Sequence, residues 1–367
     1  MGSVGIDISS NMITLVELLK SRKGIVIKNA AEFEISTESI KKGELQDPVA
    51  LSKGLKDAWK KNRFTGRNVF AGLSNLKAIV REVELPLVSA EEINNSLKYQ
   101  INDFIPIPKD NILYDYYIME QTEGSSKLML VGAMKSMINN VIEAIKSAGL
   151  ITQAIDLNCF SLFRTIDEVY DLKKDKQTNC AVYIGRDISI IEILQGDTLK
   201  FPRFLSNSIS SFIDNIQKST GADEKKARQS LAGFDFKSII PGKTGSVSSS
   251  DKKEKDTEAG DADKAAAEQD EDIIKSINAT ADNFINEIRM SVEHFLQDDT
   301  KAKIGKILLS GEKLDNIGEY IKYKTNYRVE EINVSEGFTV EMVNKGGNTG
   351  KILDPLPIGM ALRGIKQ

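Results

Sequence analysis

The fold of this chain is decided by residues 4–18, which read VGIDISSNMITLVEL. Two apolar runs flank the short polar turn Ser9-Ser10-Asn11, and apolar side chains alternate with other residues in both runs. This pattern predicts a β-hairpin. Asp7 lies just before the turn, so its carboxylate and the hydroxyl and amide groups of the turn would together suit a phosphate. An ordinary hairpin with an exposed polar turn is the alternative.

The composition is that of a soluble globular protein with more than one domain. With 367 residues and a formal net charge of −4, the chain has room for two or more domains and no basic surplus for nucleic acid. No apolar stretch approaches the ~18 residues that span a bilayer, and we expect no signal peptide. A single histidine, His294, rules out a multi-histidine metal site. Cys159 and Cys180 have apolar neighbours, as expected for buried thiols in a reducing compartment.

The order of the predicted elements indicates a duplication. Residues 1–76 read as three strands, a helix that begins at Asp47-Pro48, and a fourth strand. A β-α-β-β-α unit follows, and the opening pattern then returns in residues 181–194, which read AVYIGRDISIIEIL. An internal repeat of this kind predicts two similar subdomains that face each other across a cleft.

The predicted domain boundaries follow from this repeat. They are 1–76 plus 151–176 for the first subdomain, 77–150 for an inserted subdomain, 177–220 plus 302–367 for the second subdomain, and 221–301 for a helical subdomain. Within the helical subdomain, residues 243–272 carry ten acidic side chains, five lysines and one large aliphatic residue, Val247. Such a segment buries too little apolar surface to offset its ordering entropy, so we predict a disordered acidic linker at 243–272. An acidic interaction tail is the alternative.

Three features together resemble a known family. They are Gly5-Ile6-Asp7-Ile8 at the start, Phe104-Ile105-Pro106-Ile107-Pro108 at the end of a helix, and Asp115 in the strand that follows. On these residues the chain resembles the PilM family of type IV pilus assembly proteins, actin-like relatives of the cell-division protein FtsA. The resemblance implies an α/β, actin-like two-lobe fold with duplicated ribonuclease H-like subdomains. The insert at 77–150 then stands for the extra subdomain of this family.

The resemblance also implies partners and a location. A protein of this family would be cytoplasmic, at the inner face of the cytoplasmic membrane, which it would reach only through partners. It would bind the short cytoplasmic N-terminal tail of the inner-membrane protein PilN, together with other inner-membrane and motor components of the pilus. We expect the tail between the first subdomain and the insert, in a groove formed by Ile105, Pro106, Ile107 and Pro108. Two prolines stiffen this loop, and exposed isoleucines would meet an apolar peptide. In the alternative, Phe104 and Ile105 only pack the insert.

A nucleotide site is implied where the family binds ATP with magnesium. Its residues would be Asp7, Ser9, Ser10, Asn11, Gly185, Arg186, Ser310 and Gly311. The chain departs from the family at this site, because Tyr183 stands where the second turn usually has aspartate. The glycine-rich adenosine turn is also shortened, and Glu312 follows Gly311 in it.

These departures favour a scaffold without phosphoryl transfer, because the missing carboxylate would order the magnesium ion or the attacking water. We therefore assign no catalytic residue and no metal ligand. Two alternatives stay open. One is a working ATP-binding and ATP-hydrolysing switch of the same machine, and the other is a cell-division anchor of the FtsA kind.

Overall fold

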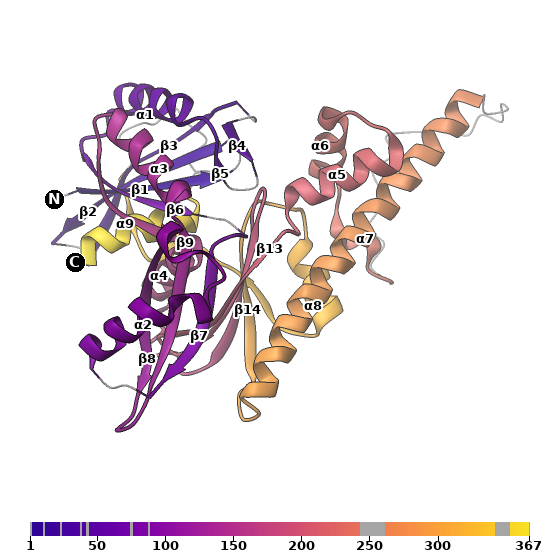
Figure 1. Cartoon of the computed structure of the whole chain (residues 1–367). Helices are drawn as coiled ribbons and strands as arrows, with labels where there is room; N and C mark the ends of the chain where they lie inside the picture. Colours follow the sequence, from indigo (N-terminus) through magenta and orange to yellow (C-terminus); the bar gives the residue numbers. More distant parts are fainter. Residues whose placement is uncertain are drawn as a thin grey trace. The chain divides into compact units, whose positions relative to one another are not determined.

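The computed structural model describes residues 2–9, 12–22, 24–36, 39–41, 44–73, 76–86, 89–242, 261–341 and 353–366. The chain divides into two compact units (Figure 1). Unit 1 comprises residues 1–172 and 334–367, and unit 2 comprises residues 173–333. A β-sheet built around one of the two predicted hairpins forms the centre of each unit.

The main sheet of unit 1 has the strand order β10-β6-β1-β2-β3-β16. Its strands are β1 (Gly2–Ser9), β2 (Met12–Ser21), β3 (Gly24–Glu34), β6 (Asn68–Leu73), β10 (Ile151–Leu157) and β16 (Thr339–Val340). Strand β1 pairs antiparallel with β2 and parallel with β6. The predicted first hairpin is therefore confirmed, with Ser9 opposite Met12. Ser10 and Asn11, which join the two strands, lie outside the described residues.

Helices cover both faces of this sheet (Figure 1). The helices on one face are α1 (Pro48–Asn62) and α3 (Lys135–Ser147), and those on the other are α4 (Asn158–Tyr170) and α9 (Pro355–Lys366). Helix α1 begins as predicted, because the Asp47 side chain accepts hydrogen bonds from the N–H groups of Val49 and Ala50. A short ribbon of β4 (Ile40–Lys41) and β5 (Glu44–Leu45) precedes it.

The last helix belongs to unit 1, which corrects the predicted second subdomain of 177–220 plus 302–367. Most side chains of α9 are buried, and the helix packs on β1, β2, β6 and α4. Gly5 of β1 permits this packing, because a Cβ atom there would collide with the carbonyl oxygen of Pro357. The prediction was wrong because it took neighbours in sequence for neighbours in space, whereas the chain leaves unit 2 and returns to cover the sheet of unit 1.

The predicted insert contains a three-stranded sheet with the order β7-β9-β8. Its elements are β7 (Ile79–Leu85), α2 (Ala90–Phe104), a short 3₁₀ helix (Lys109–Asn111), β8 (Ile112–Gln121) and β9 (Ser126–Met134). Helix α2 begins with a capping box of Ser89 and Glu92. Helix α3 also falls within 77–150, but it packs against α1, and the Asn140 amide donates to the carbonyl oxygen of Leu45 at 3.2 Å. The insert therefore continues into the first subdomain through α3.

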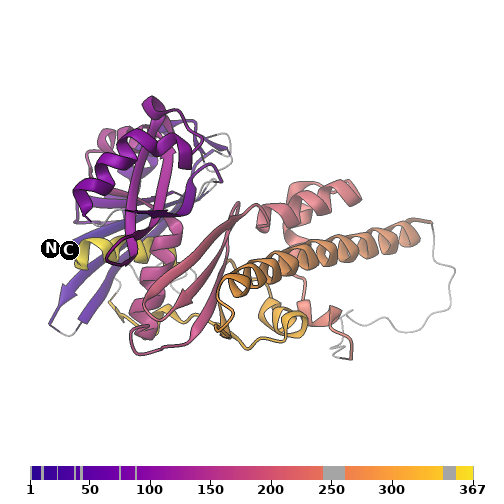
Figure 2. The same cartoon turned by 60° about the horizontal axis from the view of Figure 1, so that its bottom comes forward.

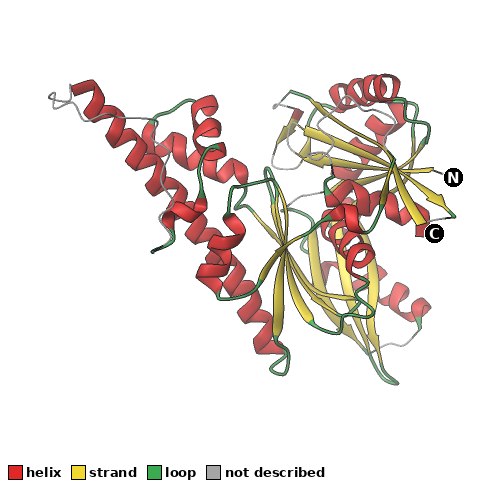
Figure 3. Cartoon of the chain, turned by 180° about the vertical axis from the view of Figure 1, so that it is seen from behind, coloured by secondary structure: helices red, strands yellow, loops and turns green. Residues whose placement is uncertain are grey.

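Unit 2 has a five-stranded sheet with the order β13-β12-β11-β14-β15. Its strands are β11 (Thr178–Ile184), β12 (Ser189–Gln195), β13 (Thr198–Leu205), β14 (Ile304–Gly311) and β15 (Val329–Glu331). Its helices are α5 (Ile209–Thr220), α6 (Glu224–Ala232), α7 (Asp261–Asp298) and α8 (Ile317–Thr325). The long helix α7 runs beside α5, as Figure 2 shows. Figure 3 shows the strands and helices from behind.

Part of the predicted acidic linker is helical. Residues 261–272 form the first turns of α7, so the prediction of disorder is wrong for them. Three consecutive alanines at 265–267 favour helix, and acidic residues near a helix N-terminus interact favourably with its dipole. Residues 243–260 lie outside the described residues. None of the helices in the described ranges is long and apolar enough to cross a membrane.

Candidate functional site

Asp7 lies near the end of β1 and is 2% exposed. Its carboxylate accepts hydrogen bonds from Ser9 Oγ at 2.5 Å and from Asn158 Nδ2 at 2.8 Å. Asn158 is the first residue of α4, and Gly72 of β6 stands opposite Asp7 in the parallel register. A Cβ atom at Gly72 would collide with Asn158 and with Met360 of α9. Asp7 and Ser9 are thus brought together as predicted, and both carboxylate oxygens already accept hydrogen bonds from within unit 1.

The turn between β11 and β12 is the counterpart of this site in unit 2. A Cβ atom at Gly185 would collide with the carbonyl oxygen of Ile188, so the turn closes tightly only with glycine. The carbonyl oxygens of Gly185 and Arg186 accept hydrogen bonds from the N–H groups of Ile209 and Ser210 at 3.0 and 2.8 Å. Those N–H groups open α5, where an anion would otherwise find donors. The turn itself therefore accepts the hydrogen bonds of the first two N–H groups of α5.

Arg186 is held by an acidic residue from the next turn. Its Nε atom donates to Glu312, and the two side chains are 31% and 36% exposed. The backbone N–H of Glu312 also donates to the carbonyl oxygen of Ile184 at 2.7 Å. The preceding residue, Gly311, has a φ of +105°. Strand pairing sets Tyr183 and Ile184 opposite Ser310 and Gly311, and Gly185 and Arg186 follow directly. The nucleotide-binding role of Gly185, Arg186, Ser310 and Gly311 stays a prediction. No local pattern predicts the Arg186–Glu312 pair, because its members are 126 residues apart.

The strand register identifies the position in unit 2 that corresponds to Asp7. Asp7 stands opposite Gly72, the second-to-last residue of β6, and Tyr183 stands opposite Ser310, the second-to-last residue of β14. Tyr183 is buried where the first hairpin has a carboxylate. The Ser310 hydroxyl is buried and has no hydrogen-bond partner among the residues that the structure describes. The two hairpins therefore present different chemistry at equivalent positions.

Both cysteines are buried, as the sequence predicted. Burial, assisted by the charge of Glu192, raises the pKa of the Cys180 thiol to about 12. At neutral pH this thiol stays protonated, so it is a poor nucleophile. Within the described parts of the chain, no group of three or more His, Cys, Asp or Glu side chains could hold a metal ion.

The loop after α2 differs from the predicted peptide groove. Ile105 and Ile107 are 0% and 8% exposed and belong to the apolar core of the insert, so the prediction that they are exposed is wrong. In the extended segment after α2 the two isoleucines point inward, while Pro106 and Pro108 are exposed. The Asn102 amide fixes the loop by donating to the carbonyl oxygen of Ile107 at 2.8 Å.

The junction between the insert and the first subdomain lies within unit 1. Lys77 forms an ion pair with Glu44 of β5 at 2.6 Å, and the exposed Leu76 precedes it. On the other side of the insert, Asn140 of α3 bonds to Leu45 of the same ribbon. Sequence reasoning missed these residues because none of them belongs to a local motif. Only the folded chain brings β5, the start of the insert and α3 together.

The sequence model of one family, described as type IV pilus assembly protein PilM, matches residues 5–233 of this chain. The chain belongs to this PilM family. It is also similar to a solved structure described as the PilM-PilN type IV pilus biogenesis complex, with a TM-score of 0.79 and 20% identity over 100% of this chain and 99% of that chain. A second similar structure is the ethanolamine utilization protein EutJ from Carboxydothermus hydrogenoformans, with a TM-score of 0.51 and 11% identity over 99% of this chain and 89% of that chain. These likenesses establish the fold of this PilM-family chain, which is actin-like as predicted.

Proposed function

We propose that this PilM-family chain binds the cytoplasmic N-terminal tail of a PilN protein, at the inner face of the cytoplasmic membrane, and links the pilus motor to the inner-membrane platform. Membership of the family supports this proposal. So does the high structural similarity to a chain of the PilM-PilN complex, which extends over the whole length of both chains. Other pilus components are further partners in this proposal.

We also propose that the chain performs this role without transferring phosphate. One observation that supports this part is the ion pair of Arg186 with Glu312, because this predicted nucleotide-site residue already faces a carboxylate. Such a partly exposed pair is worth roughly 0.2–1 kcal/mol, so it alone would not exclude a nucleotide. Magnesium in phosphoryl-transfer sites is, however, held by one or two carboxylates besides the phosphates. With Tyr183 in one hairpin and an internally bonded Asp7 in the other, the residues present do not fit magnesium with ATP.

The proposed binding place for the tail is unit 1, beside the junction of the insert and the first subdomain. Pro106 and Pro108 form its exposed rim, and the buried Ile105 and Ile107 hold that rim in place from below. The Asn102 hydrogen bond and the two prolines already order this loop, so the loop would lose little conformational entropy when a peptide binds.

Titration of the full chain with a labelled peptide would test both parts. The peptide is the cytoplasmic N-terminus of the PilN protein encoded with this chain, and a scrambled peptide is the control. We expect saturable binding by fluorescence anisotropy, with the same affinity with and without ATP and magnesium. Absence of binding would overturn the partner proposal. ATP hydrolysis that Asp7→Ala abolishes would overturn the scaffold and favour the ATP-driven switch.

A second titration locates the tail. We expect the double variant Pro106→Ser/Pro108→Ser to bind the peptide about fivefold more weakly, because each lost proline adds freedom to the free loop. Pro241→Ser in unit 2 is the matched control, since Pro241 is also exposed. Equal affinity of the two variants would place the groove on another part of the protein.

A further inference from the structure

Unit 2 contains a pocket at the end of its sheet that lies opposite the predicted nucleotide residues. It has a volume of about 690 Å³ and is lined by the start of β11 and β14, the end of β12, and the turn after α7. Thr178 opens β11 and Gly185 follows its last residue, so the two ends of the strand are roughly 20 Å apart. This pocket is therefore a separate site within unit 2.

Basic side chains surround this pocket, which we call the basic pocket. Its charged members are Lys176, Lys301, Lys303, Arg328 and Asp299. The three lysines form no ion pair with any residue that the structure describes, and Arg328 has one long contact, from Nη2 to Glu330 at 3.5 Å. The side chain of Arg328 is 75% exposed. A chain with a net charge of −4 thus has an excess of positive charge at this pocket, with four cations and one acid in its lining.

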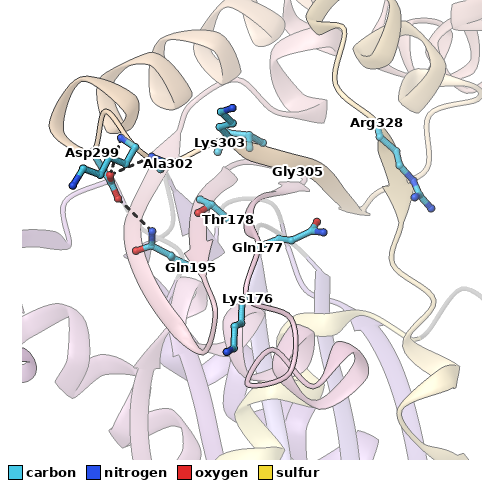
Figure 4. A pocket seen from close by; sticks show the side chains of 11 residues that line it. Lys176, Gln177, Thr178, Gln195, Asp299, Ala302, Lys303, Gly305 and Arg328 are labelled. Carbon is cyan, nitrogen blue, oxygen red and sulfur yellow. Dashed lines mark hydrogen bonds between the residues drawn. The ribbon is translucent and has the colours of Figure 1, made fainter.

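The single acid of the basic pocket is already engaged. Asp299 accepts hydrogen bonds from the backbone N–H groups of Lys301 and Ala302, both at 3.2 Å. It also accepts from the Gln195 amide at 3.3 Å. Figure 4 shows these bonds at one side of the pocket, away from Arg328. Asp299 therefore shapes the turn after α7, its charge offsets one of the four cations, and the three lysines are exposed.

The floor of the basic pocket offers groups that suit a peptide main chain. Ile304 pairs with Thr178 and Ile307 with Cys180, so β14 carries one extra residue, a bulge, at Gly305 and Lys306. Gly305 is exposed and has no side chain to cover its backbone. The neighbouring Asn179 is buried and does not line the pocket. The exposed amide of Gln177 completes this floor.

We propose that the basic pocket binds an acidic peptide segment of a protein partner. Figure 4 shows Lys303, Lys176 and Arg328 on different sides of Gln177 and Thr178, pointing in different directions. A small anion such as phosphate would reach only some of them, whereas an extended segment with several carboxylates would reach all. The carboxylates would pair with the cations, and the peptide main chain would bond to Gln177 and to the backbone at Gly305. This site is independent of the proposed PilN-binding place in unit 1.

The test uses the full chain and a labelled synthetic peptide in which glutamate alternates with glycine. The same peptide with glutamine in place of glutamate is the neutral probe. We expect anisotropy to report binding of the acidic peptide only, and to weaken as salt is added because the contacts are exposed. Equal binding of the neutral probe, or no binding of either peptide, would overturn the proposal.

Variants of the basic pocket separate a site from general attraction. Lys301→Glu/Lys303→Glu should weaken binding about tenfold, because two contacts are lost and two repulsions are added. The control Lys218→Glu/Lys225→Glu changes the net charge equally at exposed positions on α5 and α6, and should bind as the natural chain does. Gly305→Phe fills the pocket without a change in charge and should also abolish binding. Its added Cβ would lie close to the movable end of Gln177 and 3.3 Å from Asn179 Oδ1, and close to no backbone atom, so we expect this variant to fold.

Two outcomes would contradict the assignment. Equal loss of affinity in both charge-reversal variants would reduce the effect to the net charge of the protein. The second outcome is that the acidic peptide does not bind, whereas inorganic phosphate binds to the natural chain and not to Lys301→Glu/Lys303→Glu. The ligand of the pocket would then be a small anion and not a peptide. Thermal unfolding of each variant shows whether it is folded, and Lys176→Glu replaces any double variant that is not.

Discussion

Two hairpins can be compared, β1–β2 in unit 1 and β11–β12 in unit 2. The first strand of each pairs in parallel with a later strand, β1 with β6 and β11 with β14, at equivalent registers. Their polar groups nevertheless differ. Asp7 bonds to the first residue of α4, whereas Arg186 bonds to Glu312 of the neighbouring turn. In both cases a group that could meet a ligand meets the chain itself. The same backbone arrangement can therefore carry different polar groups, because strand pairing and core packing do not depend on the residues at the turns.

The largest difference in stability between the two hairpins is expected at Gly5 and Ala181, which occupy equivalent positions in the strand register. Gly5→Ala should lower the free energy of unfolding by about 3 kcal/mol, because the added methyl group collides with the backbone of α9. Ala181→Gly should cost only about 1 kcal/mol, since it removes one methyl group and adds freedom to the unfolded chain. Urea titration followed by circular dichroism measures both. Equal costs would contradict the close packing of α9 on β1.

The next effect concerns the carboxylate that only the first hairpin has. Asp7→Ala should lower the free energy of unfolding by about 1–3 kcal/mol, because Asn158 loses a buried acceptor. Ser9→Ala removes only a donor near the surface and should cost less. Thermal unfolding of the two variants under the same conditions gives the comparison. A larger loss for Ser9→Ala would show that the Asp7–Asn158 bond does not anchor α4.

The smallest effect concerns the pair that only the second hairpin has. A double-mutant cycle of Arg186→Ala and Glu312→Ala should give a coupling free energy below about 1 kcal/mol, since both side chains are about one-third exposed. High salt should reduce it further. A coupling of several kcal/mol would mean that the pair holds the two turns together rather than only neutralising Arg186.

Local signals predicted much of the fold. The hairpins and the start of α1 at Asp47 were found because alternation and capping depend on residues close in sequence. Strand β13 was missed because Pro202 interrupts it, and a proline usually argues against a strand. The edge strand β15, with only three residues, offered too short a pattern.

The site was less predictable, because its geometry depends on distant partners. Nothing near Arg186 in the sequence points to Glu312, and nothing near Asp7 points to Asn158. The loop after α2 shows the same limit in another form. Its isoleucines and prolines alternate, and the sequence alone did not decide which pair would face the core. The basic pocket was missed because residues near 176, 301 and 328 meet only in the folded sheet.

The position of α9 has a consequence for biosynthesis. The first strand leaves the ribosome early, yet the helix that covers one face of its sheet is synthesised more than 340 residues later. Until then, β1, β2 and β6 expose apolar surface, which chaperones and proteases recognise in nascent chains. Contacts so distant in sequence also form slowly. A chain that ends prematurely within unit 2 would therefore leave unit 1 incomplete, so quality control of the whole protein depends on its last helix.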